Sequence, residues 1–133
     1  MESHRKMLRA KIHRATVTDA NLDYEGSLTL PPELMEVSDI RAYEAIQVWN
    51  VDRGTRFETY AITGVRGSGQ ICVNGAAAHL AGPGDRIIIA SFSSVPESLV
   101  GTFRPLVVFV DEHNRAIRTG VEAPGPHTRG DGC

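Results

Sequence analysis

Closely spaced turn signals divide this chain into short segments, and they restrict the fold more than any other feature of the sequence. Asp52-Arg53-Gly54, Asn74-Gly75 and Gly82-Pro83-Gly84-Asp85 each lie between runs rich in apolar, β-branched or aromatic residues. Such turns join neighbouring strands. Many short strands with frequent turns are typical of a small barrel or sandwich, and not of a parallel α/β sheet. We therefore predict a mainly β fold with short helices.

The boundaries of the expected strands and helices follow from these turns. Strands are predicted at 7–17, 45–51, 55–63, 70–73, 86–92, 105–111 and 115–119. The second and third should form a hairpin, and so should the last two. Proline is tolerated in the first turn of a helix, so Pro31-Pro32 favours a short helix through Val37, and 76–79 favours a helical turn.

The first predicted strand carries two basic side chains on one face. Side chains alternate between the two faces of a strand. One set is Leu8, Ala10 and Ile12, and the other set is Lys11, His13, Ala15 and Val17. Lys11 and His13 therefore share a face, where they are either exposed strand charges or site residues.

The segment 55–63 holds a second group of reactive side chains. Arg56, Glu58 and Tyr60 share one face, and Thr59 faces away. If Arg56 and Tyr60 point into a site, a guanidinium that suits a carboxylate lies beside a phenol that can give a proton. The alternative is that Arg56 forms an ordinary surface salt bridge.

Size and charge narrow the functional classes. At 133 residues, one domain is expected, which we place at 1–119, followed by a flexible tail at 120–133 that is rich in glycine and proline. The chain has 14 basic and 16 acidic residues, and 6% of its residues are aromatic. With this balance of charge and few rings for base stacking, we expect no nucleic acid and no membrane as a partner.

Compartment and metal content are predicted from what the chain lacks. No apolar run reaches the ~20 residues that span a bilayer, and no signal-peptide core follows the N-terminus, so we expect a cytoplasmic protein. We expect no structural disulfide between Cys72 and Cys133. The five histidines have no paired metal-ligand spacing and Cys72 is isolated, so no metal site is predicted.

The dipeptide Gly26-Ser27 allows two interpretations. By itself it is most simply a loop between a strand and a helix. A serine hydroxyl can also attack the preceding carbonyl and turn the amide into an ester, and glycine at 26 does not hinder that attack. Elimination and hydrolysis would then leave a ketone at the new N-terminus, with a donor near the Gly26 carbonyl to stabilise the oxyanion.

Asn74-Gly75 is most simply a turn, but its backbone N–H groups could hold an anion or a carbonyl.

Two further classes of function stay open on the residues alone. A small β-barrel can bind a ligand or partner without catalysis, and Lys11, Arg56 and Tyr60 would then be surface residues. A serine hydrolase would use Ser27 as its nucleophile, but the chain has no Gly-x-Ser-x-Gly segment around it and no acid–His–Ser order.

Several segments, taken in order, match the pattern of one known family. They are Lys11-Ile12-His13-Arg14, Tyr24-Glu25-Gly26-Ser27, Val48-Trp49-Asn50-Val51, Thr59-Tyr60-Ala61-Ile62 with Arg56-Phe57 before it, Val73-Asn74-Gly75-Ala76-Ala77-Ala78-His79 and Ile88-Ile89-Ala90-Ser91-Phe92. In this order the chain resembles the aspartate 1-decarboxylases, self-processing pyruvoyl enzymes that make β-alanine for pantothenate synthesis. Several motifs over most of one domain are far more specific than any single one.

The resemblance implies a six-stranded double-psi β-barrel and a homotetramer with active sites between neighbouring subunits. It implies autocatalytic cleavage between Gly26 and Ser27, which makes a covalent pyruvoyl group from Ser27 and dispenses with metal and pyridoxal phosphate. The processing roles fall on Gly26, Ser27, Tyr24 and Thr59, with Thr59 assisting at the Gly26 carbonyl. The resemblance leaves open whether a maturation factor assists the cut.

The implied substrate is L-aspartate, whose amine forms a Schiff base with the pyruvoyl carbonyl before CO2 leaves. Arg56 should hold one carboxylate of the substrate, with Lys11 and His13 placed to help at the other end, and Tyr60 should reprotonate the carbanion. The remaining implied substrate-binding residues are Trp49, Asn74, Gly75, Ala76, Ala77 and Ile88. The segment 28–32, the extra N-terminal residues and the tail depart from the family, and none of them touches these positions.

Overall fold

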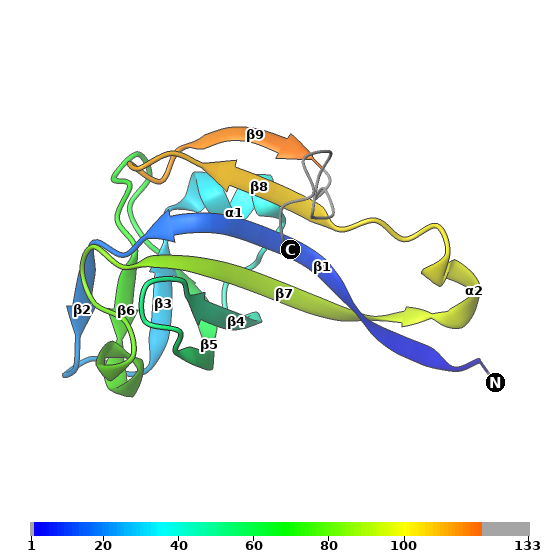
Figure 1. Cartoon of the computed structure of the whole chain (residues 1–133), viewed down its shortest axis with the longest axis horizontal. Helices are drawn as coiled ribbons and strands as arrows, with labels where there is room; N and C mark the ends of the chain where they lie inside the picture. Colours follow the sequence, from blue (N-terminus) through cyan, green and yellow to red (C-terminus); the bar gives the residue numbers. More distant parts are fainter. Residues whose placement is uncertain (1, 121–133) are drawn as a thin grey trace, which may run out of the picture.

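The computed structural model describes residues 2–120 as one sheet of nine strands with short helices (Figure 1). The strands are β1 (His4–Thr16), β2 (Asp19–Asn21), β3 (Ser27–Leu30), β4 (Ala45–Asn50), β5 (Arg56–Thr63), β6 (Cys72–Asn74), β7 (Arg86–Pro96), β8 (Leu106–Val110) and β9 (Ala116–Gly120). The helices are α1 (Pro32–Ser38), the 3₁₀ helix η1 (Gly75–His79) and α2 (Glu97–Val100). The predicted mainly β fold is confirmed. The predicted tail lies outside the described residues except for Gly120, which belongs to β9.

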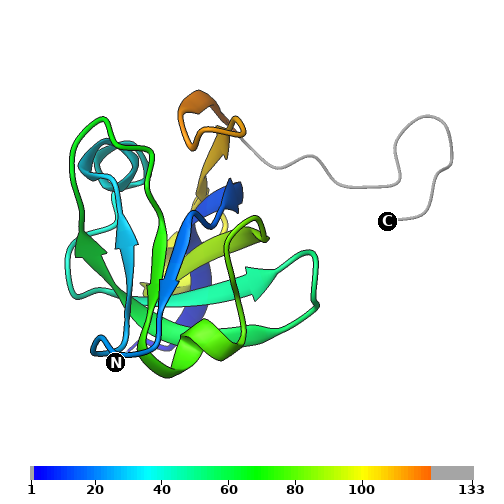
Figure 2. The same cartoon turned by 90° about the vertical axis from the view of Figure 1, so that its left-hand side faces the viewer.

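Strands that are far apart in the sequence lie side by side. The order across the sheet is β2-β6-β3-β5-β4-β7-β1-β8-β9. β1 and β7 form the longest pair, antiparallel from His4 opposite Pro96 to Thr16 opposite Arg86, and Figure 1 shows them as two long adjacent ribbons. The sheet is mixed, because β3 runs parallel to β5 and β1 runs parallel to β8. Seen from the end in Figure 2, the strands curve around a common interior, as in a barrel.

The structure has nine strands where the resemblance implies six. Very short segments join the sheet, including β2 and β6 with three residues each and β3 with four. β2, β3 and α2 were not predicted, because a segment of three or four residues is too short to show a repeating pattern of apolar residues. The predicted hairpin of β4 and β5 is confirmed, as are the antiparallel pair β8 and β9, the helix α1 and the turn η1.

The hydrophobic core lies against one face of the central strands. The buried side chains that alternate inward from β1, β4 and β7, each no more than 1% exposed, are Ile12, Ile46, Val48, Ile87 and Ile89. Burying an aliphatic side chain of this size contributes about 1.5–3 kcal/mol. Because side chains alternate along a strand, the residues between them point to the opposite face, away from this core.

An irregularity in β1 corrects the alternation predicted for its second half. The pairing with β7 shifts between Ile12 and Ala15, and Arg14 has a φ of 64°. An extra residue in one strand reverses the faces of the residues that follow it. Ala15 and Val17 therefore join the hydrophobic core. The sequence pattern had predicted them on the opposite face, with Lys11.

The helices of the described residues are short. α1 begins after the extended residue Pro31 and ends where Asp39 adopts a left-handed φ of 56°. Its Leu34 and Met35 pack into the core. Within residues 2–120, no helix is long and apolar enough to cross a membrane.

Candidate active site

Gly26-Ser27 lies where β3 begins, beside β6. Ser27 is the first residue of β3, is only 3% exposed, and stands opposite Asn74 in the antiparallel ladder. The Asn74 amide nitrogen Nδ2 donates to Ser27 Oγ at 2.8 Å and to Thr29 Oγ1 at 3.0 Å. The expectation that the segment 28–32 does not touch the site is therefore wrong at Thr29. The interpretation of Ser27 as part of a loop is therefore wrong: it opens a strand, and the pairing with β6 holds its hydroxyl against a buried amide.

Gly75 packs against Gly26, the first residue of the Gly26-Ser27 peptide bond. It has a φ of +74°, a conformation that residues with a side chain rarely adopt. A Cβ at this position would lie 2.8 Å from Gly26 Cα, 2.9 Å from Gly26 N and 3.0 Å from the backbone oxygen of Tyr24. Only glycine allows this close approach. Asn74-Gly75 thus contacts both residues of the Gly26-Ser27 bond, Ser27 through a side chain and Gly26 through the backbone.

β5 brings Thr59 and Tyr60 toward the start of β3. The parallel ladder of these strands begins one residue after Ser27 and one residue after Tyr60. Continued back by one residue, the register puts Ser27 beside Tyr60, and continued by two it puts Gly26 beside Thr59. By alternation, Tyr60 shares a face of the sheet with Ser27 and Thr59 has the opposite face. This register agrees with separate roles for the two β5 residues.

Trp49, Arg56 and Ile88 form one row across three strands. Trp49 of β4 pairs with Arg56 of β5 and with Ile88 of β7. Paired residues share a face, so all three lie on the face that turns away from the core. The Arg56 guanidinium carbon lies 4.9 Å from the centroid of the Trp49 ring, a stacked contact that leaves the N–H edge of the guanidinium available for a carboxylate. Within residues 2–120, no carboxylate forms an ion pair with Arg56.

Lys11 lies in the neighbouring row of the same face. Its row runs from β1 through β7 to Gln47 of β4 and Glu58 of β5. Lys11 is only 7% exposed, so the interpretation as an exposed strand charge is wrong for this residue. His13 is half-buried, and its ring meets Phe109 edge-on with 5.6 Å between the centroids.

Three other predicted residues lie at the margin of this arrangement. Ala76 and Ala77 follow Gly75 in η1, where Ala76 is exposed and Ala77 is half-buried against the core. Tyr24 is 64% exposed, and its backbone oxygen is the atom that approaches Gly75. The structure therefore joins the backbone of Tyr24 to the site, while its phenol extends into solvent.

Comparison with known proteins covers all of these positions. A family model described as aspartate decarboxylase matches residues 3–117. The chain belongs to the aspartate decarboxylase family. The aspartate 1-decarboxylase of Rhodopirellula baltica is 55% identical over 128 residues, which are 96% of this chain and 82% of that protein. The one from Legionella pneumophila strain Paris is 58% identical over 96% of each chain, and the one from Myxococcus xanthus is 52% identical over 94% of this chain and 97% of its own. The resemblance drawn from the motifs is confirmed.

Sequence reasoning about this decarboxylase missed a partner of Asn74. The thiol of Cys72 donates to Asn74 Oδ1 at 3.1 Å. Burial, and to a smaller extent the negative charge of Asp19, raise the pKa of the Cys72 thiol. The thiol therefore keeps its proton at neutral pH. Cys72 and Asn74 are two residues apart, and side chains at that spacing share a face when both residues lie on one strand. The predicted strand ended at residue 73, so the spacing did not signal this contact.

A second missed residue is Tyr43, which lies beside Tyr60. The two rings stack with 6.4 Å between centroids and 27° between planes. Tyr43 is 79% exposed and has a φ of 71°, a conformation that bulky residues rarely adopt. The loop before β4 therefore holds this ring next to Tyr60 at a cost in backbone strain.

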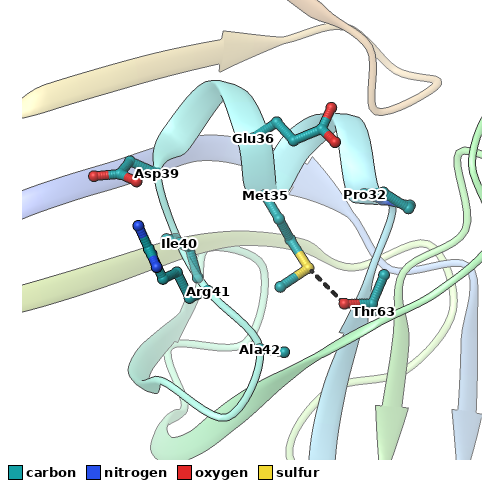
Figure 3. Close-up of a pocket in the computed structure, with 8 residues that line it drawn as sticks. All are labelled: Pro32, Met35, Glu36, Asp39, Ile40, Arg41, Ala42 and Thr63. Atoms are coloured by element: carbon teal, nitrogen blue, oxygen red, sulfur yellow. Dashed lines mark hydrogen bonds between the residues drawn. The ribbon is translucent and has the colours of Figure 1, made fainter.

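The pocket in Figure 3 lies apart from these residues, between α1, the loop that follows it and β5. It has a volume of about 390 Å³ and is lined by Pro32, Met35, Glu36, Asp39, Ile40, Arg41, Ala42 and Thr63. None of the predicted site residues lines it, so we assign it no role in decarboxylation. Among residues 2–120, no three His, Cys, Asp or Glu side chains are grouped so that they could hold a metal ion.

Proposed function

We propose that this chain decarboxylates L-aspartate to β-alanine and CO2, a step of pantothenate synthesis, after cutting itself between Gly26 and Ser27. The observation that carries the proposal is the contact of Ser27 Oγ with the Asn74 amide at 2.8 Å, at a residue that is 3% exposed. The relatives described above are named aspartate 1-decarboxylases, which supports the substrate and the reaction.

The cut begins when Ser27 Oγ attacks the carbonyl carbon of Gly26. The bond from that carbon to the Ser27 nitrogen breaks, the hydroxyl proton passes to the nitrogen, and the amide becomes an ester of equal mass. Loss of the Ser27 Cα proton expels Gly26 as a carboxylate, and hydrolysis of the resulting residue releases ammonia and leaves a ketone. Thr59 supplies a hydroxyl for the oxyanion at the Gly26 carbonyl. Tyr24 is the remaining residue to which we assign a part in processing.

The group formed at position 27 is a pyruvoyl, which supplies a sink for the electron pair left when CO2 departs. The surrounding residues suit such a group. Ser27 lies on the sheet face that carries Arg56 and Tyr60, and a side chain at position 75 would collide with the adjoining peptide. Asn74 and Gly75 would hold the group.

Charged residues on the same face bind the substrate. Arg56 holds one carboxylate through two parallel N–H bonds, and Lys11 and His13 help with charge at the other end. Trp49 orients the Arg56 guanidinium by stacking. Tyr60 holds a proton at its Oη and delivers it to the carbon from which CO2 has left. The other substrate-binding residues are Asn74, Gly75, Ala76, Ala77 and Ile88.

The proposal includes partners and location. The proposed assembly is a homotetramer in which a neighbouring subunit completes each site. Arg56 is exposed and Tyr60 is half-buried in the single chain, so a neighbouring subunit could reach both. A maturation factor, where the cut needs one, would make cutting faster in cell extract than in buffer. The expected location is the cytoplasm, which cell fractionation checks.

Intact mass spectrometry of the purified chain tests the proposed function. We expect two chains, residues 1–26 and residues 27–133, whose masses add up to that of the whole chain plus water minus ammonia. Supplied with L-aspartate, the same sample should release CO2 and β-alanine. A chain that stays whole in buffer and in cell extract, and makes no β-alanine, would instead support a non-catalytic β-barrel.

Replacing Tyr60 by phenylalanine should separate processing from turnover. Tyr60→Phe keeps the ring beside Tyr43 but removes the phenolic hydroxyl. The chain should still appear as two pieces, while kcat falls about 10²–10⁴-fold, the usual contribution of a general acid. The matched control is Tyr43→Phe, which removes the neighbouring phenol and should keep both activities. Wild-type turnover by Tyr60→Phe would exclude this phenol as the proton source.

A further inference from the structure

Cys72 is connected to Ser27 through a single side chain. Its thiol donates to Asn74 Oδ1 at 3.1 Å, and Asn74 Nδ2 donates to Ser27 Oγ at 2.8 Å. Ser27 and Asn74 are 3% and 4% exposed. The antiparallel ladder pairs Ser27 with Asn74 and Thr29 with Cys72, so all four residues share one face of β3 and β6.

The orientation of the Asn74 amide depends on these neighbours. An asparagine amide can be turned over with almost no change in shape, so its hydrogen bonds decide which end faces Ser27. The hydroxyls of Ser27 and Thr29 can donate or accept, and they fit either orientation. The thiol favours the observed orientation, in which its S–H donates to the amide oxygen, because in the reversed orientation an amide N–H would face sulfur, a weak acceptor, in place of a hydroxyl oxygen. Burial and the Asp19 carboxylate, which raise the pKa of Cys72, keep that proton in place.

The amide orientation matters for the reacting hydroxyl. A serine side chain has three staggered rotamers, and a hydrogen bond from a buried amide selects one of them. Attack on the preceding carbonyl requires a defined position of the oxygen, and an error of about 1 Å can cost 10²-fold in rate. With its oxygen end toward Ser27, the amide would instead accept a hydrogen bond from the Ser27 hydroxyl and turn the lone pairs of Oγ to new directions.

We infer that Cys72 is a positioning residue for the cut: its thiol holds the Asn74 amide oxygen, so that the amide nitrogen keeps Ser27 Oγ in place for attack on Gly26. This inference rests on the proposed cut at Gly26-Ser27. During the attack, Oγ forms a bond to the Gly26 carbon, that carbon loses its bond to the Ser27 nitrogen, and the hydroxyl proton moves to that nitrogen. The Asn74 amide and the Cys72 thiol keep their protons throughout.

Two substitutions at position 72 test the inference. Cys72→Ala removes the donor, and Cys72→Val removes the donor but keeps a side chain of similar volume. We follow the conversion of whole chain to two chains by intact mass after a pulse of cell-free synthesis. Cys72→Ala should cut about tenfold more slowly, the effect of losing one hydrogen bond in a buried network. Cys72→Val should be slowed to the same degree, because it fills the space of the thiol without a donor.

A second measurement separates positioning from stability. The matched control is Thr63→Ala, which removes the hydrogen bond from Thr63 Oγ1 to Met35 Sδ, another contact with sulfur (3.6 Å), seen in Figure 3. Thermal unfolding of each variant is measured in a Ser27→Ala background, which cannot cut. A positioning role predicts slow cutting by Cys72→Ala that its change in Tm does not explain, and normal cutting by Thr63→Ala.

The outcomes distinguish the inference from the proposed function beneath it. Equal cutting rates for Cys72→Ala and wild type overturn the inference and leave the proposed function intact. Wild-type cutting by Cys72→Val overturns it too, because that side chain has no donor to hold the amide oxygen. Slow cutting by Thr63→Ala to the same degree assigns the effect to general loss of stability. A wild-type chain that never cuts overturns the proposed function instead.

Discussion

We expect Ser27→Ala to leave the chain whole and without aspartate decarboxylase activity. The substitution removes the hydroxyl that must attack the Gly26 carbonyl, and no other atom of the residue can replace it. The fold should remain, since Asn74 keeps its hydrogen bond to Thr29 and the loss of one hydrogen bond costs about 1 kcal/mol. Intact mass should show a single chain, and an assay for β-alanine should show none.

The matched control for this variant is a buried serine elsewhere. Ser38 is 0% exposed and its Oγ donates to the backbone oxygen of Leu34 at 2.6 Å. Ser38→Ala removes a buried hydroxyl at a similar cost in stability, and it should cut and turn over normally. Two chains from Ser27→Ala, with the break still after Gly26, would show that another nucleophile makes the cut.

We expect Gly75→Ala to slow the cut by about 10²-fold, because the added methyl group displaces the peptide that must react. Its Cβ would meet backbone atoms of Gly26 at 2.8 and 2.9 Å, and backbone cannot swing aside as a flexible side chain can. The left-handed φ of +74° adds a cost of about 1 kcal/mol or more in folding free energy. Time-resolved intact mass measures the cutting rate, and thermal unfolding measures the stability.

Gly67 provides the control that separates these two effects. Its φ of +78° is nearly the same, but a Cβ there would meet no atom within 4 Å. Gly67→Ala should therefore lose a similar amount of stability from backbone strain and cut at the wild-type rate. If both variants cut equally slowly, strain alone explains the effect, and the contact of Gly75 with Gly26 has no role in processing.

Local patterns predicted the parts of this fold that depend on neighbours in sequence. The hairpin of β4 and β5 was predicted because the turn 52–54 and the alternating strands around it are local signals. β3 was missed, since its four residues pair with β5 and β6, which come much later in the chain. The bulge at Arg14 was missed as well, because nothing in the sequence near Arg14 signals a left-handed residue.

For the site too, sequence patterns predicted some residues and missed others. The two-residue period put Arg56 and Tyr60 on one face without any structure, and the family motifs singled out Ser27, Asn74 and Gly75. The period could also have linked Cys72 to Asn74, but a spacing of two residues has meaning only once both are known to lie on a strand.

The sequence alone determined membership of the aspartate decarboxylase family and the residues of the proposed chemistry: the bond between Gly26 and Ser27, and the guanidinium and phenol of β5. The tertiary structure decided which groups meet. It buried Lys11, set the Asn74 amide against Ser27 Oγ, and packed Gly75 onto Gly26. These contacts join residues nearly fifty positions apart. They depend on the register between strands, which the packing of the whole sheet selects and no local pattern specifies.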